Sequence, residues 1–353
     1  MDIAKLDKNM AIKDPEKNLY WYNARELTIE GKGWKETESF YSRLPAKAKG
    51  IVRDPVWELS QCSAGISIHF TTNTSSLAVK WDGVHAMDHM TAVGVSGLDL
   101  YVKHDGQWKW LAVAKPTQEL NESQLFTDLP SESRDYLLYL PLYNPVHKIE
   151  LGIPAPFELK PTPPRNKKPI VFYGTSITQG GCASRPGMCY TAILGRWLDT
   201  PVINLGFSGN GIMEPEVIDL LAALDPAIYV LDNMPNMEES AINEREESAI
   251  RKLRAARPKT PIVLIDNILY CNAFLRESSM NRYTSSNMVQ YAIYEKLIKE
   301  GMQNLHYIKD DALLGTDGEA TVDGTHFTDL GYMRFSEKLI GPLRTIITNK
   351  GHC

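Results

Sequence analysis

The stretch IVFYGTSITQG at residues 170–180 decides the fold of the C-terminal half of this chain. Residues 170–173 are apolar and have the length of a short buried strand, and the small residues after them predict a turn. That turn places Ser176 just beyond the carboxyl end of the strand, where a base can reach its hydroxyl. The pattern is G-x-S-x-T rather than the G-x-S-x-G of many lipases, so taken alone it favours a serine that only caps a turn or helix.

Strand and helix patterns alternate through the rest of this half. The further apolar segments of strand length lie at 202–205, 228–231 and 262–265, and the helical patterns lie near 189–198, 216–224, 240–256, 288–300 and 328–348. Such alternation predicts a parallel sheet with helices on both faces. Ligands of these sheets bind beyond the carboxyl ends of the strands, so residues placed there are the first candidates for a site.

The first 155 residues have a different period. Apolar residues alternate with a period of two at 65–70, 77–81, 98–102, 108–111, 136–140 and 148–152. Asp105-Gly106 is a hairpin-type turn between two of these segments. Many short strands separated by turns predict an all-β sandwich or jelly roll.

Prolines and basic residues crowd the stretch between these halves, at residues 154–169. This composition is typical of an extended, solvated linker. The sequence therefore predicts a β-sandwich domain at 1–155, a Pro-rich linker at 156–168 and an α/β domain at 169–353.

Composition excludes several classes of protein. Hydrophobic residues make up 43% of the 353 residues and charged residues 23%, which are ordinary globular values. The net charge of −5 gives no electrostatic footprint for nucleic acid and no polybasic membrane patch. No apolar run approaches the roughly 18 residues of a membrane helix, so no membrane insertion is expected. The oligomeric state is not readable from these features.

The start of the chain and the cysteines say little about the compartment. The first 20 residues lack the apolar region of a signal peptide, as a processed secreted or periplasmic protein also would. Five dispersed cysteines without C-x-x-C spacing favour free thiols over a disulfide framework or a structural zinc site. A bridge between Cys182 and Cys189 stays open.

A D-x-x-H pattern near the end of the chain supplies a candidate base. A serine hydroxyl is a poor nucleophile and needs one. His326 can take that part, and Asp323 on the same turn can hold the tautomer of its ring. Taken alone, the same pattern favours a turn that caps the helix predicted from residue 328.

Two loops between these motifs carry candidate oxyanion donors. The NLGFSGNG loop at 204–211 follows the second strand, and its Gly209 lets a backbone N–H approach a substrate closely. Asn236 follows the third strand and carries a side-chain N–H₂ donor. A phosphate-binding interpretation of the glycine loop is weak because no G-x-x-x-x-G-K-[ST] pattern is present.

Taken together and in this order, Ser176, Gly209, Asn236 and the pair Asp323/His326 resemble the four sequence blocks of the SGNH (GDSL-like) hydrolase family. The resemblance covers about residues 168–345. It departs from the family pattern where a threonine replaces the usual aspartate before the serine, and where the third block keeps its asparagine but loses its glycine and aspartate.

The first half also resembles a known module. The segments SAGI at 63–66, GLDLY at 97–101 and YLPLY at 139–143 are similar to the GxDLY-type β domain that precedes some bacterial SGNH hydrolases, which resemble carbohydrate esterases. The resemblance implies a three-layer α/β/α hydrolase with a flavodoxin-like parallel sheet behind a β-sandwich. It implies a serine esterase that removes an acyl group, with acetyl on a carbohydrate as the expected substrate, without metal or organic cofactor.

In the implied mechanism Ser176 is the nucleophile, His326 the base and Asp323 its partner. The oxyanion donors are the backbone amides of Ser176 and Gly209 and the side chain of Asn236. The partner is then a small-molecule or oligosaccharide ester. Two other functions stay open: a lipid or thioester acyl hydrolase, and a carbohydrate-binding protein with a degenerate hydrolase domain.

Three weaker features favour structural interpretations. His85 and His89 lie four residues apart beside two aspartates, but without a helix this is a poor metal signal, and a loop that shapes the esterase pocket is the more attractive hypothesis. His306 has no acidic partner at useful spacing. Six of the seven tryptophans lie in the first 110 residues, and sandwich core and rim positions are more common for them than sugar stacking.

Overall fold

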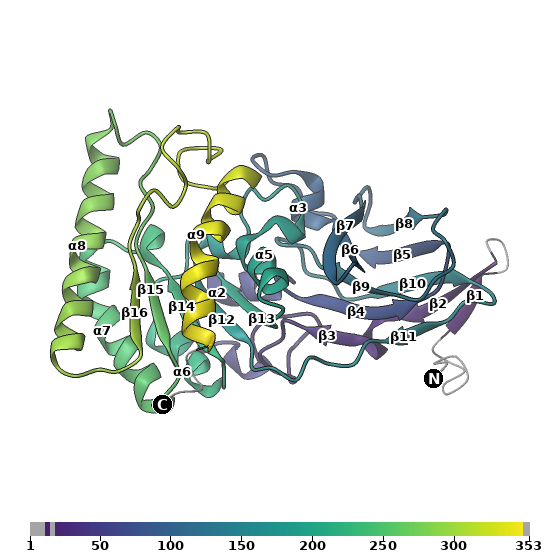
Figure 1. Ribbon diagram of the computed structural model, residues 1–353, viewed down its shortest axis with the longest axis horizontal. Helices are drawn as coiled ribbons and strands as arrows, with labels where there is room; N and C mark the ends of the chain where they lie inside the picture. Colours follow the sequence, from purple (N-terminus) through teal and green to yellow (C-terminus); the bar gives the residue numbers. More distant parts are fainter. Residues whose placement is uncertain (1–10, 15–17, 349–353) are drawn as a thin grey trace. The chain divides into compact units, whose positions relative to one another are not determined.

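The computed structural model describes residues 11–14 and 18–348, and the chain divides into two compact units (Figure 1). Unit 1 comprises residues 1–46, 61–166 and 184–187, and unit 2 comprises 47–60, 167–183 and 188–353. The chain therefore passes between the units several times. Residues 47–60 cluster with unit 2 although the sequence places them in the first domain, and the predicted boundaries at 155 and 169 stay predictions.

Unit 1 is built from two antiparallel sheets. The first has the order β1 (Ala11–Asp14), β2 (Leu19–Asn23), β10 (Ile149–Pro154), β5 (Leu77–Asp82), β8 (Leu120–Phe126). The second has the order β11 (Leu159–Pro161), β4 (Ser67–Thr72), β9 (Arg134–Tyr139), β6 (Leu98–His104), β7 (Gln107–Ala114), with β3 (Thr28–Glu30) paired to β4. The short helices of unit 1 are η1 (Ala24–Glu26) and α3 (Ala92–Ser96).

Alternate residues of these strands form one core. Ile68 and Phe70 of β4 and Ile149 and Leu151 of β10 are all fully buried in the same hydrophobic cluster. Burial of alternate positions is what a period of two produces when one face of each sheet packs inward. The predicted turn at residues 105–106 has positive φ at both positions and joins β6 to β7, as in a two-residue hairpin loop.

Asp99 in the GLDLY segment is the centre of a buried polar network in unit 1. Its carboxylate accepts hydrogen bonds from the Trp110 indole at 3.1 Å, the Arg185 guanidinium at 2.8 Å and the Gly187 amide at 2.8 Å. The Tyr101 hydroxyl accepts a second bond from Arg185 at 2.6 Å. Burial alone would lower the pKa of Arg185, but the Asp99 carboxylate reverses this and raises it, so the guanidinium stays charged.

Unit 2 contains a five-stranded parallel sheet. Its order is β13 (Val202–Gly206), β12 (Ile170–Gly174), β14 (Ile228–Asp232), β15 (Ile262–Ile265), β16 (Leu305–Ile308). All residues of β12, β14 and β15 are buried, as expected for strands covered on both faces. The direction of the strand order reverses at β12, which makes the carboxyl ends of β12 and its neighbours the topological switch point.

Helices cover this sheet. On one face α5 (Tyr190–Trp197) packs against α9 (Asp329–Thr348), and α9 is the yellow helix drawn across the sheet in Figure 1. A second row is formed by α6 (Pro215–Ala223), α7 (Glu239–Ala256) and α8 (Glu277–Lys299), each in contact with the next. The connection from β12 to β13 runs in one direction along the sheet, and the connections from β13 to β14, β15 and β16 run in the other. Because such crossovers are right-handed, α5 lies on the opposite face from α6, α7 and α8. The remaining short helices are η2 (Ala46–Ala48), α2 (Asp54–Gln61), α4 (Ser176–Gln179), η3 (Pro186–Met188) and η4 (Met234–Asn236).

The predicted fold class is confirmed: an all-β unit is joined to a three-layer α/β/α unit with a parallel sheet. Some elements differ from the sequence prediction. α8 begins at Glu277 rather than near residue 288, because its first turns are polar and show no apolar period. The Pro-rich segment contains β11, which pairs with β4.

The structure also settles smaller features of the described residues. Cys62, Cys182, Cys189 and Cys271 are free thiols, so no bridge joins Cys182 to Cys189, and Cys353 lies outside the described residues. His306 lies on β16, where burial lowers its pKa. None of the helices in the described part of the chain is long and apolar enough to cross a membrane.

Candidate active site

Ser176 is the first residue of the short helix α4, directly after β12. Thr175 caps this helix: its hydroxyl accepts a hydrogen bond from the Ile177 amide at 3.2 Å, and the Thr178 hydroxyl accepts one from the Thr175 amide at 3.3 Å. This reciprocal capping box fixes the turn that the sequence predicts. Ser176 keeps 7% of its surface exposed, whereas its neighbours Thr175 and Thr178 have none exposed.

A buried carboxylate lies beneath this turn. Asp232, the last residue of β14, accepts hydrogen bonds from the Thr178 hydroxyl at 3.0 Å and the Tyr190 hydroxyl at 2.9 Å. Burial raises the pKa of Asp232 to about 6, although both hydrogen bonds act in the opposite direction. Because Thr178 belongs to the capping box, this network ties the turn of Ser176 to the end of the neighbouring strand.

Ser176, His326 and Asp323 form a hydrogen-bonded chain. The Ser176 Oγ lies 2.8 Å from His326 Nε2, and His326 Nδ1 lies 2.6 Å from Asp323 Oδ2. When Nδ1 carries the ring proton and donates a hydrogen bond to Asp323, Nε2 can accept a hydrogen bond from the serine hydroxyl. Partial burial alone would raise the pKa of Asp323, but hydrogen bonds from the backbone and ring of His326 outweigh it and lower that pKa.

The loop that carries His326 is held by contacts from two sides. Asp323 Oδ1 accepts from the His326 amide at 2.8 Å, which closes a tight local turn. Gly324 has a φ of +94°, a conformation that side chains rarely adopt, and its carbonyl accepts from the Cys271 amide at 3.2 Å. The buried Tyr332 of α9 donates to the carbonyls of Ile177 and Gly181, which joins the helix after the loop to the helix that carries Ser176.

Gly209 lies in the loop that follows β13, and Asn236 is the last residue of η4, which follows β14; these two strands lie on either side of β12. Gly206, at the end of β13, allows the chain to pass close to α4, because a Cβ at this position would come within 2.1 Å of the Gln179 amide nitrogen. Gly209 is exposed with a φ of +67° and has open space around its Cα. Asn236 Oδ1 accepts a long hydrogen bond from the Gly211 amide at 3.4 Å, which leaves its N–H₂ group to donate elsewhere.

A cavity of about 360 Å³ adjoins the Asp323 turn, and the sequence motifs gave no signal for it. Its lining comes from the turn itself, from η4 and from the segment that leads into α8: Pro235, Tyr270, Asn272, Arg276, Ser278, Ser279, Arg282, Asp323 and Thr325. Small-molecule sites typically measure about 300–1,000 Å³, so this space suits a small polar ligand. The segment was missed because it has neither a strand period nor a helix period, and its position follows from the fold alone.

The described residues contain no group of three metal-ligating side chains placed to hold an ion. His85 and Asp88 lie in a loop of unit 1 without such a cluster. That the same loop shapes the esterase pocket stays a prediction.

Comparison with known proteins decides the family. The model of the GDSL-like lipase/acylhydrolase family matches residues 167–344, about half of the chain, and a model described as the N-terminus of an SGNH-hydrolase-type esterase matches residues 19–159. A Bacteroides ovatus protein, whose crystal structure is described as that of a GDSL-like lipase, is 36% identical, with 94% of this chain and 98% of that chain covered and a TM-score of 0.90. The chain belongs to the GDSL-like lipase/acylhydrolase family. It is accordingly an enzyme that hydrolyses ester bonds.

Two more distant structures share the fold. A salicylyl-acyltransferase from a tetracycline biosynthetic pathway is 18% identical, with coverage of 95% and 96% and a TM-score of 0.75. A family two carbohydrate esterase from Clostridium thermocellum, in complex with cellohexaose, is 13% identical, with coverage of 80% and 92% and a TM-score of 0.60. The comparison with curated proteins found no match.

Proposed function

We propose that this protein is a serine esterase that works through an acyl-enzyme on Ser176 and removes acetyl groups from a carbohydrate. The observation that carries the proposal is the chain of hydrogen bonds from Ser176 Oγ through the His326 ring to Asp323, at 2.8 Å and 2.6 Å. A base within this distance of a hydroxyl, itself oriented by a carboxylate, is the arrangement that activates a serine nucleophile.

The reaction proceeds in two stages. Ser176 Oγ bonds to the ester carbonyl carbon while its proton passes to His326 Nε2. The tetrahedral intermediate then breaks its bond to the alcohol oxygen, and His326 returns the proton to the departing alcohol. Water attacks the acyl-serine with His326 again as the base, which releases the acid and restores the serine. Asp323 holds the ring and stabilises the imidazolium between these steps.

The negative charge of each intermediate needs donors, and three groups at the sheet edge supply them in this proposal. They are the backbone amides of Ser176 and Gly209 and the side-chain N–H₂ of Asn236. β13 and β14 flank β12, so the loops that bear Gly209 and Asn236 lie on either side of the Ser176 turn. Preorganised donors of this kind each contribute about 10²–10³ in rate.

A carbohydrate substrate is supported by the polar lining of the neighbouring cavity and by the fold likeness. An acetyl xylan esterase from Butyrivibrio proteoclasticus shares the fold at 12% identity, with coverage of 93% and 98% and a TM-score of 0.58. The cavity beside Asp323 is lined mostly by hydroxyl, amide and guanidinium groups. Such groups suit the hydroxyl groups of a sugar better than an acyl chain.

One observation favours a second candidate, a hydrolase of longer acyl esters. Phe274 and Leu275 are 79% and 82% exposed in the segment before α8, close in sequence to Asn272 of the cavity. Exposed apolar side chains beside a site can contact an acyl chain. A panel of p-nitrophenyl esters from acetate to decanoate separates the two functions: the proposal expects kcat/KM to be highest for acetate, and a maximum at long chains would favour the second candidate.

Replacement of the nucleophile tests the mechanism. We expect Ser176→Ala to lower kcat for p-nitrophenyl acetate by at least about 10³-fold, because no other group can form the acyl-enzyme. Ser248→Ala removes an exposed hydroxyl on α7 and serves as the matched control, with unchanged turnover expected. Circular dichroism checks that both variants are folded. Turnover by folded Ser176→Ala at the wild-type rate would rule out the mechanism.

A further inference from the structure

The cavity beside the Asp323 turn adjoins two segments that carry residues of the proposed site. Asp323 and Thr325 line it, and both belong to the turn that ends at His326. Pro235 lines it on another side and directly precedes Asn236. A substrate held between Ser176 and Asn236 therefore has this space next to it. The inference that follows rests on the proposed function.

Two guanidinium groups line the cavity without acidic partners. Arg276 immediately precedes α8 and is exposed, and Arg282 lies on the second turn of that helix. Within residues 11–14 and 18–348, no ion pair of either arginine is found. By contrast Arg251 and Arg334 each have a carboxylate at 2.8 Å or less. Arginines left unpaired beside a cavity are typical donors to a ligand carboxylate.

Two buried polar atoms of the same lining also lack partners among the described residues. Arg282 Nε has a free N–H although Nη2 of this side chain donates to the Pro235 carbonyl at 2.8 Å. Asn272 Oδ1 is a free acceptor. Both atoms have almost no exposed surface, so they lie behind the cavity wall, and the polar groups of the lining left to contact a ligand include the Arg276 guanidinium and the hydroxyls of Ser278 and Ser279.

The acidic side chains that the structure describes around the cavity do not pair with the guanidinium groups of Arg276 and Arg282. Asp323 is the one acidic residue in the lining, and the amide and ring of His326 already bind its oxygens. Glu238 and Glu239 line a neighbouring cavity, which shares Ser278 and Arg282 with this one. The first turn of α8 adds partial positive charge from the helix dipole, and it also carries the carboxylate of Glu277.

We propose that this cavity is a subsite for a sugar acid: the alcohol half of the substrate carries a carboxylate that binds Arg276 and Arg282. Its hydroxyl groups bind the two serines at the start of α8, Ser278 and Ser279. A planar carboxylate matches the fork of a guanidinium and supplies the counter-charge that a neutral sugar lacks. The substrate class is thus an acetylated uronic acid or an oligosaccharide that contains one.

A pair of substrates that differ only in charge tests the proposal. Mono-O-acetylated galacturonic acid is compared with mono-O-acetylated galacturonamide, which has the same ring and the same ester. We expect kcat/KM of the wild-type enzyme to be about tenfold or more higher for the acid, the range typical of a hydrogen bond to a charged group. The preference should appear mainly in KM and should weaken with salt.

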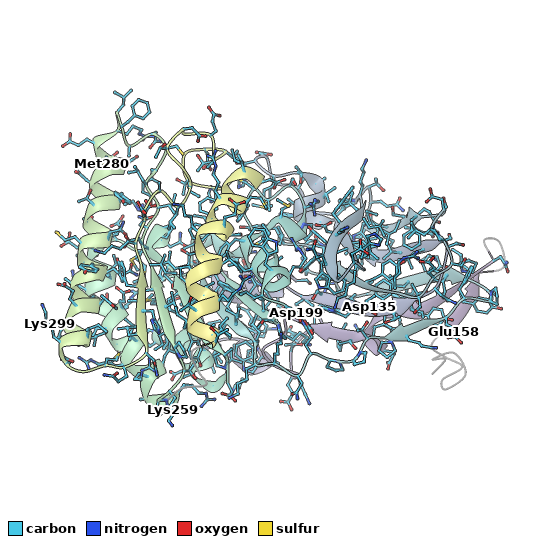
Figure 2. The ribbon with its side chains drawn as sticks, in the orientation of Figure 1. Asp135, Glu158, Asp199, Lys259, Met280 and Lys299 are labelled. Atoms are coloured by element: carbon cyan, nitrogen blue, oxygen red, sulfur yellow. The ribbon has the colours of Figure 1, made fainter. Side chains whose placement is uncertain are left out.

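Two variants locate the preference. Arg276→Gln should lower the ratio of acid to amide several-fold, mostly by raising KM for the acid, while Arg282 keeps part of the preference. Lys299→Gln makes the same change of charge at the other end of α8, where Figure 2 labels Lys299, and should leave the ratio unchanged. Arg276 is the better choice than Arg282 because it is exposed and does not hold the backbone next to Asn236.

The outcomes separate this proposal from the proposed function. Equal kcat/KM for acid and amide in the wild-type enzyme, or an acid preference that Arg276→Gln leaves unchanged, overturns the subsite. If the wild-type enzyme hydrolyses p-nitrophenyl acetate but neither sugar ester, the subsite is overturned while the esterase stands. The proposed function itself fails if Ser176→Ala keeps full turnover, or if kcat/KM for p-nitrophenyl esters is highest at long chains.

Discussion

Two carboxylates of this protein each bind a basic partner, and they do so in opposite ways. Asp323 contacts His326 three residues along the chain, and its side chain is 43% exposed. Asp99 contacts Arg185 from 86 residues away, and its side chain is fully buried. The first pair sits on one turn beside a cavity, whereas the second sits inside unit 1 with the Trp110 indole and the Gly187 amide also bonded to it.

The difference in burial indicates which pair contributes to the stability of the fold and which to the proposed chemistry. A buried ion pair that loses one partner leaves an uncompensated charge, so its main effect is on stability. An exposed pair contributes little to stability because water screens it. Asp323 can therefore act on chemistry, through the ring of His326, without being essential to folding. We expect substitution to separate the two carboxylates cleanly.

The largest effect is expected from Asp323→Asn. The amide keeps the shape of the side chain but cannot stabilise the imidazolium, so kcat should fall by roughly 10³–10⁴-fold with little change in stability. Steady-state hydrolysis of p-nitrophenyl acetate measures this, and urea unfolding gives the free energy of unfolding. A variant that keeps kcat would show that Asp323 only shapes its turn.

Asp99→Asn should have the converse effect. It leaves the partly buried Arg185 charge without its counter-ion, and we expect a loss of on the order of 2–3 kcal/mol in the free energy of unfolding of unit 1. Five of the seven tryptophans belong to that unit, so tryptophan fluorescence during urea unfolding reports mainly on it. If Asp99→Asn instead reduced kcat as strongly as Asp323→Asn at unchanged stability, the contrast between the two carboxylates would fail.

A third carboxylate, Glu246, is buried without a basic partner among the described residues, and we expect it to have a smaller effect on stability that depends on pH. Glu246 on α7 is fully buried, and its partner is the neutral Gln290 amide at 2.9 Å. Burial raises its pKa to about 8, so the folded state holds a proton that the unfolded state has lost above its ordinary value of 4.5. The wild-type free energy of unfolding should therefore fall as the pH rises from about 4.5 to about 8.

Glu246→Gln removes this dependence. We expect the variant to match the wild type near pH 5 and to exceed its free energy of unfolding by on the order of 1–3 kcal/mol near pH 8. Urea unfolding at both pH values gives the measurement. A difference between variant and wild type that does not grow with pH would show that Glu246 is already charged in the folded state.

The sequence predicts much of the fold because the decisive signals are local. The strand at residues 170–173, the turn at 174–180 and the hairpin at 105–106 depend on a few adjacent residues. Asp323 and His326 are predicted for the same reason, since three residues of spacing bring them onto one turn. Ser176 joins them in the prediction only through the family order of the motifs, and the structure places its oxygen within hydrogen-bond distance of the ring.

The features that the sequence does not predict depend on contacts between distant residues. Arg185 lies in a segment without pattern, and only the fold of unit 1 brings it to Asp99. Arg276 and Arg282 reach the cavity because α8 begins eleven residues earlier than its apolar period suggests. The early start is polar, so hydrophobic periodicity gives no signal for it.

The central claim, that Ser176 is an activated nucleophile, is tested most directly by covalent labelling. The wild-type enzyme is treated with a fluorophosphonate and the adduct is located by mass spectrometry of its peptides. We predict one modified residue, Ser176, with labelling abolished in His326→Ala because the base is gone. An unlabelled Ser176 in folded wild-type enzyme, or an adduct on another serine, would contradict the claim.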